Sequence, residues 1–150
     1  MKTPHTLRVE EGPESFAPLL AAARTLGLRI GWLELGPRPD PLPTSLEQAA
    51  GLGAMRAVSV GEGRSVAVKP LRGAAVLRDL LREHFQGCVL VLIRGEVTAP
   101  ALGITDDGWT VKPAGTAARR FTPDTLAAAL RKPHPWGDPP QESQPEAPAA

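Results

Sequence analysis

The side chains that could carry out catalysis or bind a metal are three histidines and one cysteine. His5, His84 and His134 lie far apart, and together with Cys88 they show none of the short ligand spacings of a zinc site. Cys88 could act as a nucleophile paired with His84 only if a cation lowered the thiol pKa and solvent reached it. We therefore favour a non-enzymatic protein and predict no catalytic residue and no metal site. An enzyme of unknown class centred on Cys88 and His84 is the third of three hypotheses.

Two short motifs have the composition of ligand-binding loops. Gly61 to Ser65 (GEGRS) contains the glycines of a phosphate loop, but such a loop leads into a helix, and residues 66–68 have the pattern of a strand. Asp106 and Asp107 are adjacent carboxylates, yet neighbouring side chains in a turn point in different directions. Both motifs therefore predict hairpin turns, and we expect no cofactor.

Basic residues are the remaining chemical signal. Residues 1–132 hold all seventeen Lys and Arg against thirteen acids, whereas residues 133–150 hold three acids and no base. The segments 56–72 and 112–132 carry +3 and +4, and they could form one anion-binding strip if both predicted hairpins joined one sheet. A solvated surface is the alternative that we favour, because thirteen Arg against four Lys indicates a general preference for arginine. The candidate anion-binding residues are Arg56, Arg64, Lys69, Arg72, Lys112, Arg119 and Arg120.

The rest of the chain is organised around residues 72–95, which predict a helix that runs directly into a buried strand. Apolar residues recur at three- and four-residue spacing from Ala74 to Phe85, and Gly87 ends the helix. Residues 88–93 (CVLVLI) follow with no polar break, so neither face of that strand can contact water. We therefore expect this strand to lie in the interior of its sheet.

Local patterns predict the remaining elements. Prolines and glycines bound the apolar segments, and the Asp107-Gly108 step suits a tight turn. Thr122 is the expected cap of the last helix, with Pro123 at its first position. The predicted elements are a short strand at 7–10, a helix at 14–26, a strand at 28–35, a short helix from 44 or 45, a hairpin at 56–60 and 64–69, a second hairpin at 101–104 and 109–112, and a helix ending near 132.

This order of elements predicts an α+β fold, a two-layer sandwich with a mixed sheet, two hairpins and helices mainly on one face. A length of 150 residues suits one core, so we expect a single domain over residues 1–136. Residues 137–150 are rich in proline and acid and predict a disordered tail, with Trp136 packing the chain onto the domain.

Composition also restricts the cellular setting. A single cysteine cannot form an internal disulfide, and the longest apolar run is six residues, so we expect a cytoplasmic protein with no membrane association. Complete folding signals without a catalytic motif favour a small binding or adaptor domain whose partner is another protein or a second copy. Nucleic acid or another phosphoanion is the alternative partner.

Overall fold

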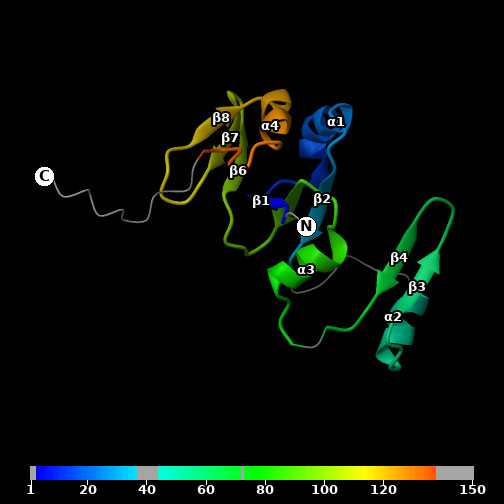
Figure 1. Cartoon of the computed structure of the whole chain (residues 1–150). Helices are drawn as coiled ribbons and strands as arrows, with labels where there is room; N and C mark the ends of the chain where they lie inside the picture. The colour runs from blue at the N-terminus through cyan, green and yellow to red at the C-terminus, as the bar shows by residue number, and fades with distance from the viewer. Residues whose placement is uncertain (1–2, 37–43, 72, 138–150) are drawn as a thin grey trace, which may run out of the picture. The chain divides into compact units, whose positions relative to one another are not determined.

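A computed structural model of the chain describes residues 3–36, 44–71 and 73–137 (Figure 1). These residues fall into two compact units, one formed by the chain up to Leu35 and from Leu81 onward, the other by Gly36–Leu80. The single domain predicted for residues 1–136 stays a prediction. The tail predicted over 137–150 lies, from residue 138 onward, outside the described residues.

The first unit is built on a six-stranded mixed sheet with the order β2-β5-β1-β6-β7-β8. The first four of these strands pair in parallel, and β6, β7 and β8 pair in antiparallel fashion. The strands are β1 (His5–Val9), β2 (Ile30–Glu34), β5 (Leu90–Arg94), β6 (Ala101–Thr105), β7 (Gly108–Lys112) and β8 (Arg119–Phe121).

β5 is an interior strand, as the sequence predicts. It pairs with β1 on one side and with β2 on the other over its whole length. All four side chains from Leu90 to Ile93 are 0% exposed. Because both backbone edges and both faces are covered, an uninterrupted apolar run is the only kind of sequence that fits this position.

One face of this sheet is covered by two helices that lie side by side (Figure 1). They are α1 (Ala17–Thr25), which continues the short 3-10 helix η1 (Pro13–Phe16), and α4 (Pro123–Ala129). Leu19 and Leu126 from the helices meet Leu7 and Leu92 from the strands in one buried cluster. The α+β fold with a mixed sheet, two hairpins and helices mainly on one face is therefore confirmed.

The helix before β5 is shorter than the sequence predicts. α3 spans Leu77–His84, and its first hydrogen bonds run to the carbonyl of Val76. Gly73 has a φ of +77°, a left-handed conformation that a helix cannot contain, so the predicted start at residue 72 is wrong. The helix ends at His84, close to the predicted end, and Gly87 has a φ of +84° in the turn that follows, where the Cys88 N–H donates to the Phe85 carbonyl at 3.2 Å.

The second unit contains α2 (Thr44–Gly51) and a hairpin of the strands β3 (Ala57–Val60) and β4 (Ser65–Val68). It also includes the first half of α3, up to Leu80. The two strands form a sheet of their own, separate from the six-stranded sheet. Both predicted hairpins are confirmed, but they do not join one sheet, so the condition for a shared basic edge is not met.

The last strand was not predictable from its local sequence, whereas the helix that follows it was. β8 (RRF) was not predicted, because two arginines and one phenylalanine carry no strand pattern of their own. α4 was predicted from its cap, and the Thr122 hydroxyl accepts a hydrogen bond from the Thr125 backbone N–H at 3.1 Å. The Thr125 hydroxyl lies 2.8 Å from the Thr122 backbone N–H, which donates to it and completes a capping box.

Gly31 in β2 provides a test of the packing on the second face of the sheet. A Cβ at Gly31 would lie within 2.8 Å of Cε1 of Phe85, the residue that follows α3. We expect Gly31→Ala to lower the free energy of unfolding by about 1–3 kcal/mol, the usual cost of overpacking, in urea titrations. Gly103→Ala is the control, because a Cβ there meets only Thr110 O at 4.0 Å, and an equal loss in both variants would contradict the packing argument.

Candidate functional site

The predicted anion-binding residues fall into two groups in different sheets. Arg56, Arg64 and Lys69 belong to the hairpin of the second unit. Lys112, Arg119 and Arg120 belong to β7 and β8 of the first unit. Arg72 lies outside the described residues. The chain therefore offers two separate basic groups, each of which has its own geometry.

Arg56 and Lys69 come together at the open end of the hairpin. In the antiparallel register they lie opposite each other, directly after the Ala57–Val68 pair on the side away from the turn. Both line a pocket of about 400 Å³, which is completed by Met55, Pro70 and Leu71. Arg64 lies at the other end, where its carbonyl accepts a hydrogen bond from the Gly61 N–H at 2.8 Å. The hairpin thus places two cations beside apolar side chains.

The cations of the first unit do not form a comparable pair. Arg119 and Arg120 are successive residues of β8, so their side chains point to opposite faces of the sheet. Arg119 lies against Gly137, where an added Cβ would be 3.2 Å from its guanidinium carbon. Arg131, also in the basic segment, donates from Nη2 to the carbonyl of Leu26 at 2.7 Å and so caps the end of α1. This segment serves partly to hold the fold together.

Cys88 and His84 do not form a nucleophile and base. No hydrogen bond joins them among the described residues, and the His84 side chain is 53% exposed beside Glu83. Burial raises the pKa of the Cys88 thiol, and the charge of Arg29 opposes that rise only in part. At neutral pH the thiol therefore stays protonated and weakly nucleophilic, although it lines a pocket of about 340 Å³ with His5 and Lys132.

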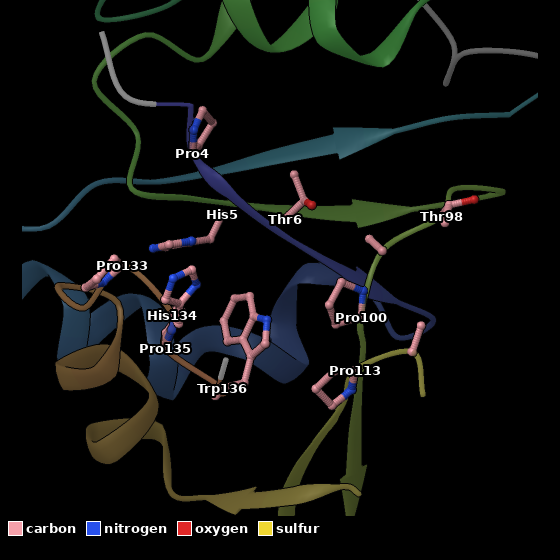
Figure 2. A pocket seen from close by; sticks show the side chains of 13 residues that line it. Pro4, His5, Thr6, Thr98, Pro100, Pro113, Pro133, His134, Pro135 and Trp136 are labelled. Atoms are coloured by element: carbon pink, nitrogen blue, oxygen red, sulfur yellow. The ribbon is translucent and has the colours of Figure 1, made fainter. Parts of the chain in front are cut away.

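A pocket of about 510 Å³ lies beside the first half of β1, and we call it the Trp136 pocket (Figure 2). Its wall is mainly proline and alanine, with one indole, two imidazoles and two threonines. Volume and composition match the concave, mostly apolar pockets that bind ligands. The lining residues are Pro4, His5, Thr6, Thr98, Ala99, Pro100, Pro113, Ala114, Pro133, His134, Pro135, Trp136 and Gly137.

His5 and Trp136 form the centre of this pocket. Their rings meet edge to face at 69° with centroids 5.5 Å apart. Burial lowers the pKa of His5, hydrogen bonding to the backbone of Leu130 and Lys132 opposes that change, and the nearby His134 adds to the lowering. The imidazole is therefore neutral at physiological pH, and the pocket centre carries no charge.

Sequence reasoning missed this pocket because four separate segments build it. Trp136 was expected to pack against the domain, which it does, since it joins the partly buried side chains around the core. One sequence feature could have indicated the pocket. The two histidines that line it are flanked by proline, in Pro4-His5 and in Pro133-His134-Pro135. Only the pairing of strands brings these segments to residues 98–100 and 113–114.

The carboxyl ends of β2 and β5 would be another common place for a ligand in a parallel sheet. Here the chain occupies that edge with its own side chains. Glu34 forms an ion pair with Arg94 and accepts a hydrogen bond from Trp32 Nε1 at 3.2 Å. The Arg94 guanidinium also lies 5.9 Å from the Trp32 ring centroid. These contacts stabilise the sheet edge, so we do not place a binding site there.

No family model matches this chain, and no curated protein matches it. Among the described residues, no group of three or more His, Cys, Asp and Glu side chains is arranged to hold a metal ion. Within the same part of the chain, no helix has both the length and the apolar character needed to cross a membrane.

The lowered pKa of His5 predicts a pH dependence of stability. The unfolded chain binds the His5 proton more readily than the folded chain, so the stability that neutral His5 provides is lost as the pH falls below about 6.5. We expect the wild type to lose more free energy of unfolding than His5→Gln between pH 7.5 and 5.5 in urea titrations.

His84→Gln is the matched control, because it removes an exposed histidine that lies outside the pocket lining. It should keep the pH dependence of the wild type. If His5→Gln shows the same pH dependence as the wild type, the burial of His5 does not influence its protonation.

Proposed function

We propose that this protein is a small, non-catalytic cytoplasmic binding protein that pairs with a second copy through the edge of β3. The observation that carries the proposal is an uneven distribution of exposed apolar side chains. Among the described residues, seven of the eight exposed large apolar side chains belong to the second unit. They are Leu52, Met55, Val58, Val60, Val66, Leu71 and Val76.

The faces of the hairpin differ in burial. Ala57 is buried on the face that packs against α2, whereas Val58 and Val60 on the opposite face are 55% and 79% exposed. Exposed valines on a solvated strand are costly, and cross-strand contacts with the valines of a second copy would bury part of their surface.

The backbone of β3 also has an open edge. The Gly61 N–H donates to the Arg64 carbonyl, so Gly61 is a hydrogen-bonded position of the hairpin. In an antiparallel pair every second residue is such a position, and Ser59 and Ala57 therefore also hydrogen-bond to β4. Val58 and Val60 therefore direct their N–H and C=O groups away from β4. A two-stranded sheet is marginal by itself, and pairing at this edge would extend it to four strands.

The sequence of β3 is complementary to itself in one antiparallel register. If two copies pair with Ser59 opposite Ser59, Val58 faces Val60 of the second copy and Arg56 faces Glu62 of the second copy. Two-fold symmetry produces each contact twice. The outward-facing backbone groups then hydrogen-bond to one another, and an ion pair closes each end of the valine contacts. This match of charge is why we choose a second copy as the occupant.

Charge reversal tests the register. Light scattering over a range of concentrations should show a dimer for the wild type and a shift toward monomer for Arg56→Glu and for Glu62→Arg, since each places like charges opposite one another. The double variant restores opposite charges and should restore the dimer.

Arg78→Glu is the matched control, because it reverses an exposed charge on α3 and should leave the dimer intact. A wild type that stays monomeric at all concentrations would contradict the proposal. A double variant no better than the single variants would contradict this register.

Phosphoanion binding is a second candidate, and the convergence of Arg56 and Lys69 on one pocket is the observation that favours it. Binding at this site predicts that Arg56→Ala combined with Lys69→Ala lowers the salt concentration for elution from heparin. Arg78→Ala combined with Arg82→Ala removes the same charge from α3 and should lower it much less. Equal effects of the two double variants would indicate attraction by net charge alone.

A further inference from the structure

The first half of β1 has an open backbone edge that faces the Trp136 pocket. β1 pairs with β6 only at Arg8 and Ala101, where the Arg8 N–H donates to the Pro100 carbonyl at 2.8 Å. His5 donates on the other side, to the Val89 carbonyl of the segment before β5. Because alternate residues of a parallel strand address opposite neighbours, the Thr6 N–H and C=O point toward the pocket.

Pro100 explains why this edge stays open. In a continued parallel ladder, the backbone nitrogen of residue 100 would donate to the Thr6 carbonyl, and proline has no N–H to donate. Within the described part of the chain, no hydrogen bond joins Thr6 to residues 98–100. The pocket therefore contains one backbone donor and one backbone acceptor side by side, which is the pattern that a peptide group of a ligand complements.

The rest of the pocket suits the side chains of an extended peptide. The ring of Trp136 and the rings of Pro100 and Pro113 provide apolar walls near Thr6 (Figure 2). None of the lining residues is acidic, and His5 and His134 supply the only titratable side chains. An aliphatic or proline side chain of the peptide can lie against the indole while its backbone pairs with Thr6.

Two cations lie near different parts of the wall of this apolar pocket. Arg119 lies against Gly137, which belongs to the wall. Lys132 lines the neighbouring pocket, which shares Pro4, His5 and Pro133 with the first. Acidic residues before and after the apolar part of a peptide would complement these charges.

We infer that the Trp136 pocket binds an extended peptide of a partner protein, in which acidic residues flank an apolar or proline residue. The peptide adds to the open edge of β1 at Thr6 and places its apolar side chain against Trp136. This site lies wholly in the first unit, so the inference does not rest on pairing through the hairpin.

A random twelve-residue peptide library displayed on phage, selected on the full-length protein, tests this inference. We expect a consensus with acidic residues on both sides of an apolar or proline residue. Synthetic consensus peptides should bind at least about tenfold more weakly to Trp136→Ala and to Arg119→Glu, and equally well to Arg78→Glu. Since Arg119 is exposed, Arg119→Glu tests the site even if Trp136→Ala fails to fold.

N-methylated peptides test the backbone contact. Successive peptide N–H groups of an extended ligand face β1 alternately, so methylation at one of two neighbouring positions should weaken binding about tenfold, and methylation at the other should have little effect.

Four results would overturn the inference. They are the absence of an acid-flanked consensus, binding that survives both pocket variants, equal binding of the two N-methylated peptides, and a consensus that reproduces the chain's own sequence after Gly137. The last result would make the chain itself the occupant in place of a partner protein.

Discussion

The desolvated backbone of β5 is the constraint on which the larger unit depends. Every polar backbone group of this strand must find a partner in β1 or β2, because the side chains from Leu90 to Ile93 exclude water from both faces. Both neighbours are parallel to it, so the chain must return to the starting end of the sheet between strands. α1 makes one such return and supplies Leu19 and Ala23 to the core. The position of α1 on the sheet thus follows from the parallel pairing of β5 with β1 and β2.

Two prolines and two glycines determine where individual strands and helices begin or end. Pro100 prevents the β1–β6 ladder from extending from its single pair, Arg8 and Ala101, toward Thr6 and so leaves the pocket edge open. Gly87 takes the left-handed conformation in the turn between α3 and β5. Gly73 prevents α3 from starting earlier, and Pro123 begins α4 at the cap that Thr122 provides. These residues limit the length of each element and so determine which backbone groups stay accessible.

Both proposed interfaces use strand edges, and neither uses a cluster of reactive side chains. Natural proteins usually protect open edges with charges, prolines or neighbouring elements. Here Arg56 and Glu62 stand at the ends of one edge, and Pro4 and Pro100 border the other. In both proposals, protection at the ends alone would let a matching strand pair with the edge and would disfavour mismatched strands.

The sequence by itself determined the features that depend on neighbouring residues. The apolar run of β5, the turns of both hairpins and the Thr122 cap were predictable because periodicity, glycine and capping chemistry act within a few residues. Only the tertiary structure decided that the hairpins belong to separate sheets, that Arg119 and Arg120 pair with β7 as a strand, and that Trp136 contacts His5 of β1. The physical reason is that these contacts join segments far apart in the chain, and their formation depends on which backbone edges and apolar faces the rest of the fold leaves unpaired.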